Sequence, residues 1–185
     1  YILSLEKDGM KPASVSRNIA SIRAFLLFLL KKGVIRDDPA EFIKPPKVIK
    51  KHPLLIDTDK INLLLGMPDI TTNKGKRDKA MLELLYATGM KVTELITLKT
   101  EDISLSGRYL ALREKRERII PFGNAARAAL EEYLKIRDKA FNKTGSDILF
   151  LNAKGGSFSR QGLWKLLKEY ALAAGIQSIN PNMIR

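Results

Sequence analysis

A short proline- and lysine-rich segment limits most strongly how this chain folds. Residues 44–53 read KPPKVIKKHP, with three prolines and four lysines in ten positions. Proline removes a backbone donor and fixes φ, so the segment favours an extended path over a helix or a central strand. We therefore expect two folded parts, residues 1–43 and 54–185, joined by a basic linker over residues 44–53. The histidine at position 52 belongs to this linker rather than to a catalytic centre.

Positive charge is distributed over both parts. The chain has 33 lysines and arginines against 20 acidic residues, a formal net charge of +13. Before Pro53 there are 11 basic and 5 acidic residues, and from Pro53 onward there are 22 and 15. An excess of this size on two bodies favours a clamp around a polyanion, and nucleic acid is the leading partner.

Other partner classes fit less well. A membrane is not expected, because no uninterrupted apolar run approaches the roughly 20 residues that span a bilayer, and AFLLFLL lies within an amphipathic pattern. The chain has no cysteine and a single histidine, so we expect neither a disulfide framework nor a metal site. It starts without methionine or a signal-peptide pattern, which we interpret as a fragment of a cytoplasmic protein.

The first part contains one strong helical pattern. Its apolar residues recur at intervals of three and four, as Val15, Ile19, Ile22, Leu26 and Leu29. We expect an N-cap at residue 14 and an end at the glycine in position 33. The polar face of this helix carries arginines 17 and 23, which suit phosphates as well as plain solvent.

The second part combines several helices with one small sheet. We expect helices capped at Asp57 or Thr58, at Asn124 and at Ser159, and a further helix over RDKAMLELLYATG. The stretch RYLALREKRERIIPF predicts a β-hairpin with residues 114–117 at its tip, and DILFL is either a strand or an extended loop. The predicted fold is therefore mainly α with a small antiparallel β-sheet, an α+β arrangement.

The stretch ATGMKVTEL predicts an elbow between two helices. Gly89 can adopt the positive φ that closes one helix, and Thr93 can cap the next through its hydroxyl. Lys91 is then presented between two helix ends. The elbow either simply connects the two helices or positions the Lys91 cation next to a negatively charged group.

Five segments in this order carry a family resemblance. They are RDKAMLELLYATGMKVTEL, LKTEDISL, the hairpin ending RERIIPF, GSFSRQGLWKLLKEYALAAGI and NPNMIR. Together with the preceding helix and linker they resemble the Xer-like tyrosine recombinases of the phage integrase family, from Tyr1 to Arg185. The resemblance implies that residues 1–43 are part of a helical core DNA-binding domain and residues 54–185 part of the catalytic domain.

The resemblance also implies a chemistry. In this family a tyrosine attacks a DNA phosphate, forming a 3′-phosphotyrosine and releasing a 5′ hydroxyl. The hydroxyl of a second strand then reverses the step by attacking the phosphotyrosine and releasing the tyrosine. No metal or other cofactor is required. Cations stabilise the pentacovalent phosphorane, and an acid protonates the leaving oxygen.

The family's catalytic positions fall on four residues here. Lys91 stands where the family has an arginine, and Lys115 is the expected proton donor in the hairpin, with Arg113 as the alternative. The His-x-x-Arg motif corresponds to Asn182 and Arg185. Lysine lacks the two parallel N–H donors that the planar guanidinium of arginine offers a phosphate. Asparagine cannot take up and release a proton as the imidazole of histidine can. With the nucleophilic tyrosine expected beyond position 185, we predict that this chain binds duplex DNA without cutting it.

Both parts are expected to contact DNA, through Ser14, Arg17, Arg23, Lys47, Lys50, Lys51, Arg116, Arg118, Arg160, Gln161 and Lys165. The intact protein is expected to form protomer–protomer contacts on DNA. Two other hypotheses remain at this point: a non-catalytic DNA-binding accessory or regulatory protein derived from the recombinase fold, and a basic helical RNA-binding protein, which would prefer RNA at matched salt.

Overall fold

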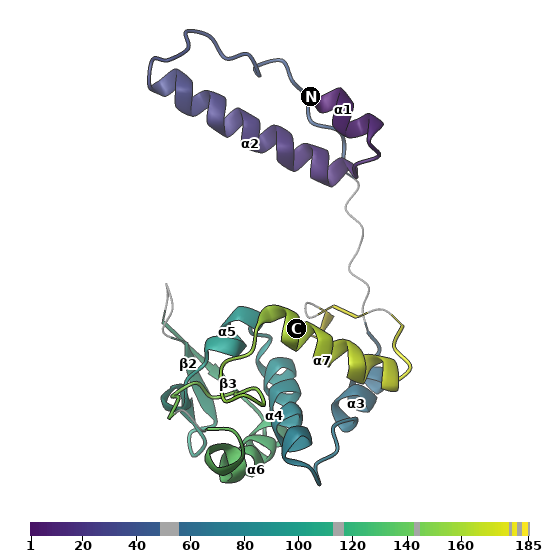
Figure 1. The fold of residues 1–185 in the computed structure, drawn as a ribbon, viewed down its shortest axis with the longest axis vertical. Coiled ribbons are helices and arrows are strands. Elements are labelled where there is room, and N and C mark those ends of the chain that lie inside the picture. Colours follow the sequence, from purple (N-terminus) through teal and green to yellow (C-terminus); the bar gives the residue numbers. More distant parts are fainter. Residues whose placement is uncertain (49–55, 113–116, 143–144, 178, 181–182, 185) are drawn as a thin grey trace. The chain divides into compact units, whose positions relative to one another are not determined.

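The computed structural model describes residues 1–48, 56–112, 117–142, 145–177, 179–180 and 183–184. Its chain divides into two compact units, Tyr1–His52 and Pro53–Arg185, hereafter unit 1 and unit 2. Figure 1 shows unit 1 as two helices and unit 2 as a helical body with a small sheet.

Unit 1 is built on one long helix. A short helix, α1 (Ile2–Lys7), precedes α2 (Pro12–Lys31), whose residues Val15 and Ile19 are buried. The helix begins at Pro12 because the fixed φ of proline suits a first turn, so the prediction that Ser14 is the N-cap was wrong. Gly33, with φ of 69°, follows the end of the helix as predicted.

Much of the apolar surface of α2 is exposed. Phe25 and Phe28 keep 59% and 54% of their surface accessible. By length and composition alone α2 could cross a membrane, contrary to the expectation from its interrupted apolar run. In this structure its Arg23 instead donates from Nη2 to the carbonyl oxygens of Ala40 (3.2 Å) and Ile43 (2.6 Å), which fastens the following segment to the helix.

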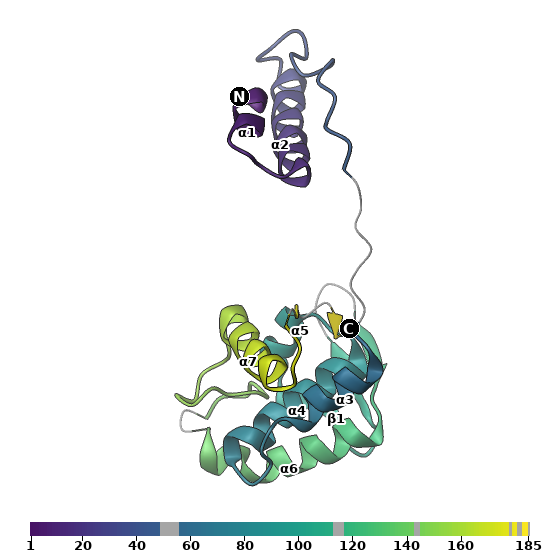
Figure 2. The same cartoon turned by 90° about the vertical axis from the view of Figure 1, so that its right-hand side faces the viewer.

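Unit 2 is organised around α4 (Asn73–Thr88). This helix is capped by the hydroxyl of Thr72 and is buried over most of its length, including the predicted stripe of Ala80, Met81, Leu84 and Leu85. Helix α6 (Asn124–Ala140) packs along it, and α3 (Thr58–Gly66), α5 (Val92–Thr97) and α7 (Arg160–Ala173) complete the helical body (Figure 2).

Of the N-caps predicted for α6 and α7, the first is wrong and the second is confirmed. The N-cap of α6 is Gly123 rather than Asn124, whose side chain instead accepts a hydrogen bond from Arg108. The hydroxyl of Ser159 does cap α7, accepting from the backbone N–H of Gly162 at 3.0 Å. The first turn of α7 therefore has a fixed start.

A three-stranded antiparallel sheet lies beside the helices, in the order β1 (Ile103–Ser104), β2 (Tyr109–Leu112) and β3 (Arg118–Pro121). The register pairs Leu112 with Arg118, which confirms the two strands of the hairpin, whereas residues 114–116 of the predicted tip lie outside the described residues. Strand β1 and the preceding 3-10 turn η1 (Thr100–Asp102) were not predicted, because their apolar runs are too short to show a period. The fold class, mainly α with a small antiparallel sheet, is confirmed.

The DILFL segment is an extended loop that makes isolated bridges rather than a strand of the sheet. Ile148 pairs with Lys99, and Leu151 pairs with Ser157. Tyr133 of α6 donates its hydroxyl to the carbonyl of Leu149 at 2.9 Å. The loop thereby connects the segment after α5 with the segment before α7.

Gly75 offers a test of the packing in unit 2. A Cβ at this position would lie 1.8 Å from the carbonyl oxygen of Asp69, a backbone atom that has little room to move. We expect Gly75→Ala to lower the free energy of unfolding by about 3 kcal/mol or more in urea titrations. Gly66→Ala is the matched control, because its Cβ would meet nothing within 4 Å. Equal stability of the two variants would contradict this close approach.

Candidate active site

The predicted elbow is present between α4 and α5. Gly89 adopts a left-handed conformation with φ of 58° and donates its N–H to the carbonyl of Leu85, which ends α4. Met90 is fully buried and anchors the turn in the core. Lys91 then precedes the first residue of α5 and is exposed. The local sequence therefore does present a cation at the elbow.

A buried glutamate, and not Thr93, caps α5. The carboxylate of Glu94 accepts a hydrogen bond from the backbone N–H of Lys91 at 2.6 Å, and Thr93 lies within the helix. The prediction of a threonine cap was therefore wrong. A glutamate three residues after an N-cap is a known capping signal, and this signal was available in the sequence.

The same carboxylate joins the elbow to the hairpin. Nη2 of Arg118, the first residue of β3, lies 2.9 Å from each carboxylate oxygen of Glu94. Only 6% of Glu94 is exposed, and a carboxylate so far removed from water requires charged or strongly polar partners. Because one buried group serves both segments, it holds the backbone of Lys91 close to the base of the hairpin.

Most of the predicted catalytic positions lie outside the described residues. They are Arg113, Lys115, Asn182 and Arg185. Ile184, the neighbour of Arg185, is 2% exposed and belongs to the core of unit 2. Of the catalytic set, the structure therefore describes Lys91 alone.

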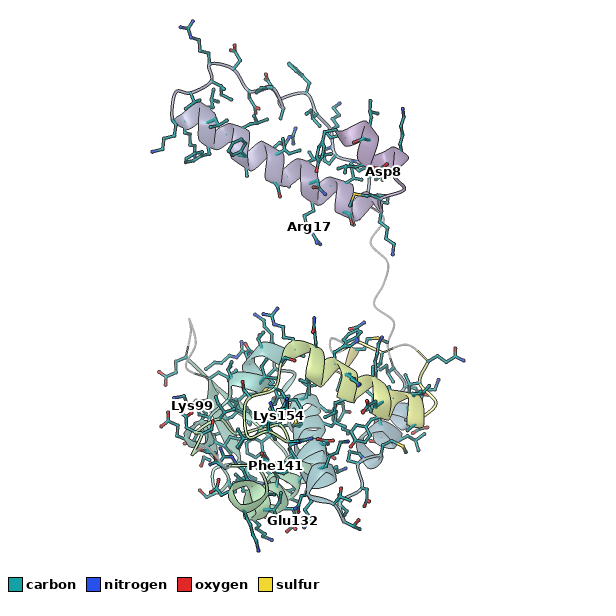
Figure 3. The ribbon with its side chains drawn as sticks, viewed as in Figure 1. Asp8, Arg17, Lys99, Glu132, Phe141 and Lys154 are labelled. Carbon is teal, nitrogen blue, oxygen red and sulfur yellow. The ribbon has the colours of Figure 1, made fainter. Side chains whose placement is uncertain are left out.

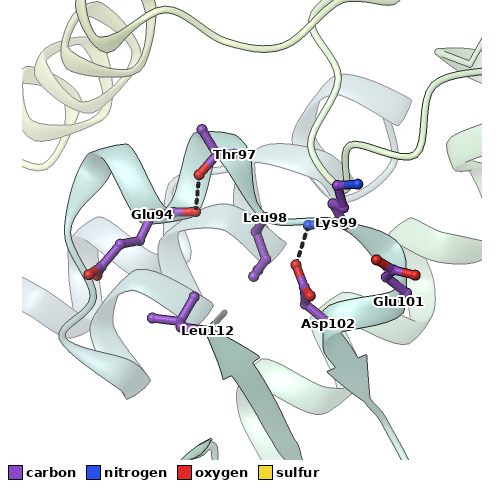
Figure 4. Close-up of a pocket in the computed structure, with 7 residues that line it drawn as sticks. All are labelled: Glu94, Thr97, Leu98, Lys99, Glu101, Asp102 and Leu112. Carbon is purple, nitrogen blue, oxygen red and sulfur yellow. Dashed lines mark hydrogen bonds between the residues drawn. The ribbon is translucent and has the colours of Figure 1, made fainter. Parts of the chain in front are cut away.

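An acidic pocket of about 350 Å³ lies beside this site, between α5, η1 and the end of β2 (Figure 4). Glu94, Glu101 and Asp102 contribute to its lining, and Figure 4 shows the carboxylate of Glu94 turned away from Leu98 and Leu112. The Glu94 carboxylate is already paired with Arg118, but the negative charges of Glu101 and Asp102 repel a phosphate, so the pocket is not where a DNA backbone would sit.

Among the described residues that line this pocket, the only lysine, Lys99, is already engaged. Lys99 pairs with Asp147 at 2.7 Å, and this hydrogen bond lowers the pKa of the Asp147 carboxyl. The lysine is thereby held by a carboxylate outside the pocket. Neutralisation of the pocket by Lys99 is correspondingly weak.

Several predicted DNA contacts are exposed and available. On α7, Arg160, Gln161 and Lys165 are exposed, and in unit 1 the same is true of Arg17 and Lys47. Figure 3 shows the side chain of Arg17 extending away from α2. Ser14 is half-buried, and Lys50, Lys51 and Arg116 lie outside the described residues.

Two predicted DNA contacts already have partners within the protein. Arg23 donates to backbone carbonyls of unit 1, and Arg118 pairs with Glu94. A guanidinium has five donors, and the side chain of Arg118 is 48% exposed, so its remaining N–H groups still reach solvent. Arg23 uses one nitrogen for three carbonyl contacts, which gives it a structural role in unit 1.

Comparisons with known proteins give a consistent result. Residues 55–185 match the model of the phage integrase family. The tyrosine recombinase XerD of Staphylococcus haemolyticus is 40% identical over 186 residues, covering 98% of this chain and 63% of the relative. XerD of Listeria innocua is 42% identical over 190 residues, covering 100% of this chain and 64% of the relative. The chain thus spans less than two thirds of the length of these relatives.

Solved structures share the fold. The XerH site-specific recombinase bound to its difH substrate matches with a TM-score of 0.74 at 18% identity, over 98% of this chain and 55% of that protein. The Tn1549 transposon integrase in complex with circular-intermediate DNA matches with a TM-score of 0.76 at 16% identity, over 99% of this chain and 67% of that one. Both of those proteins were captured on DNA.

Proposed function

This chain belongs to the phage integrase family of tyrosine recombinases, and from that membership we propose that it is the duplex-DNA-binding part of a site-specific recombinase. The single observation that carries the proposal for this chain is the contact made by Glu94. It joins the backbone of Lys91 to the base of the hairpin, and both of these segments hold catalytic positions of the family.

The catalytic roles follow the chemistry of each side chain. Lys91 neutralises the scissile phosphate, Lys115 protonates the leaving 5′ oxygen, and Arg185 grips the phosphate a second time. The ammonium of Lys91 offers the phosphate a positive charge but not the two parallel donors of a guanidinium. Asn182 can donate a hydrogen bond but cannot relay a proton. The lysine at position 91 and the asparagine at position 182 are therefore expected to slow strand cleavage more than they weaken DNA binding.

DNA contact is proposed for both units. The exposed residues of α7 suit a phosphate backbone and a groove edge, and arginine and glutamine are common readers of both. Unit 1 and the lysines of the linker add non-specific affinity. We further infer a cytoplasmic protein that forms protomer contacts on DNA and uses no metal or cofactor.

A non-catalytic DNA-binding regulator is the second candidate. The lysine at position 91 and the asparagine at position 182 favour it, because both fall on catalytic positions of one family.

On nicked duplex DNA, residues 1–185 are expected to give no covalent adduct in denaturing gels. An adduct would show that a tyrosine within the chain is the nucleophile and would contradict our assignment.

The proposal is tested by the salt dependence of duplex binding. If about five to ten phosphates are neutralised, the log–log slope of affinity against salt should be roughly −4 to −9 in fluorescence anisotropy titrations. Arg160→Gln combined with Lys165→Gln should make the slope less negative by about 2. A slope near zero, or a preference for an RNA duplex at matched salt, would overturn DNA binding as the function.

A further inference from the structure

A buried ion pair at the start of α4 contacts α7 and the residue that precedes its cap. Arg77 is 5% exposed and Asp78 is fully buried, and they lie beside the apolar core of unit 2. Oδ1 of Asp78 accepts from Nε (2.9 Å) and Nη2 (2.7 Å) of Arg77. Neither residue belongs to the proposed catalytic set, so the pair requires a separate explanation.

Asp78 fixes α7 near its C-terminal end. Its second oxygen, Oδ2, accepts a hydrogen bond from the hydroxyl of Tyr170 at 2.8 Å and lies 3.2 Å from Nζ of Lys74. Burial and the carboxylate of Asp78 raise the pKa of Tyr170, so its hydroxyl keeps the proton that it donates. The hydrogen bond therefore defines which side of α7 faces α4.

Arg77 fixes the other end of α7. Its guanidinium lies over the ring of Phe158, 4.8 Å from the centroid, and over the ring of Phe141, which is labelled in Figure 3, at 5.0 Å. Its Nη1 donates to the carbonyl of Leu151 at 3.1 Å. Phe158 directly precedes the capping residue Ser159, so this contact sets where α7 starts.

Apolar packing alone would hold α7 less specifically. Leu163, Leu166 and Leu167 are buried against the core, but apolar contacts have no preferred direction. Hydrogen bonds and a planar guanidinium do have one. A buried ion pair is costly to desolvate and often no better for stability than apolar residues, so a role in defining one arrangement explains it better than stability does.

We propose that Arg77 and Asp78 are positioning residues for DNA binding, which set both the rotation of α7 and the place of its first turn, so that Lys165 on the helix and Arg160 at its start both reach the phosphate backbone. This inference rests on the proposed function, because it requires that α7 contacts DNA. Neither Arg77 nor Asp78 contacts the nucleic acid itself. They act on DNA binding by positioning α7 through Phe158 and Tyr170.

The test removes one hydroxyl from each of two tyrosines, the half-buried Tyr170 and the buried Tyr133. Tyr170→Phe breaks the contact with Asp78, whereas Tyr133→Phe, the matched control, breaks hydrogen bonds to Leu149 and Leu151 that do not involve α7. Both variants are compared with residues 1–185 on one DNA duplex, at a temperature where circular dichroism shows all three folded. We expect the salt slope of Tyr170→Phe to be less negative by about 1 to 2, and that of Tyr133→Phe to be unchanged.

A second pair of measurements separates this inference from the function on which it rests. Phe158→Leu should reproduce the effect from the other end of α7, and it replaces Tyr170→Phe if that variant does not fold. In a chain already carrying Arg160→Gln and Lys165→Gln, Tyr170→Phe should have no further effect on the slope. Wild-type slopes in both Tyr170→Phe and Phe158→Leu would overturn the positioning role. If Arg160→Gln with Lys165→Gln leaves the slope unchanged, the proposed DNA contact of α7 fails instead.

Discussion

Strand cleavage is expected to become about 100-fold faster when Lys91 is replaced by arginine, in a protein that joins residues 1–185 to the C-terminal segment of a full-length relative. The XerD of Staphylococcus haemolyticus, 63% of whose length this chain covers, is a suitable donor of that segment, in which we propose that the nucleophilic tyrosine lies. An arginine at the start of α5 would offer two parallel donors to the phosphate where lysine offers one charge. The rate is measured as covalent protein–DNA adduct formed over time on a suicide substrate.

The matched control is Lys91→Gln, which removes the charge but keeps a side chain of similar length. Cleavage by this variant should fall below that of the lysine protein, while duplex affinity should change by no more than the loss of about one phosphate contact. If lysine, arginine and glutamine at position 91 all support the same cleavage rate, the residue does not contact the reacting phosphate.

Separation of the two units is expected to weaken DNA binding by about 10²- to 10⁴-fold. Residues 54–185 alone contain the whole of the unit 2 core, so they are expected to fold without unit 1. The loss follows because a tether converts the second contact with DNA into an intramolecular event. Fluorescence anisotropy on one duplex, at one salt concentration, compares residues 54–185 with residues 1–185.

The charge of the linker needs a control of its own. Replacing Lys47, Lys50 and Lys51 by glutamine keeps the two units connected but removes three cations. This variant should make the salt slope less negative by at most about 3 and should retain most of the gain from tethering. Equal affinity of residues 54–185 and residues 1–185 would show that unit 1 takes no part in DNA binding.

The elements of the fold were predictable where the apolar pattern was long. The stripe from Ala80 to Leu85 and the two halves of the hairpin each repeat a period often enough to identify the structure. The caps at Ser14 and Thr93 failed for a different reason. A serine or threonine near a helix start is a candidate cap, but here Pro12 and Glu94 supplied better local solutions.

The polar interior was not predictable in the same way. Arg77, Asp78 and Glu94 look like ordinary surface residues of helices, and each also has a long-range partner, namely Leu151, Tyr170 and Arg118. Tyr170, for example, meets Asp78 across 92 positions. Such contacts arise only once the helices have packed, so no local window of sequence contains them.

The shared carboxylate of Glu94 makes the hairpin and the elbow respond together. If Arg118 contacts DNA, as we propose, a phosphate that approaches it competes with this carboxylate for the same guanidinium. When Arg118 turns toward the phosphate, Glu94 keeps only the backbone N–H at the start of α5, in a place where water is scarce. Binding of a DNA phosphate at β3 would therefore change the contacts at the start of α5, because the phosphate would replace the Glu94 carboxylate as the partner of Arg118.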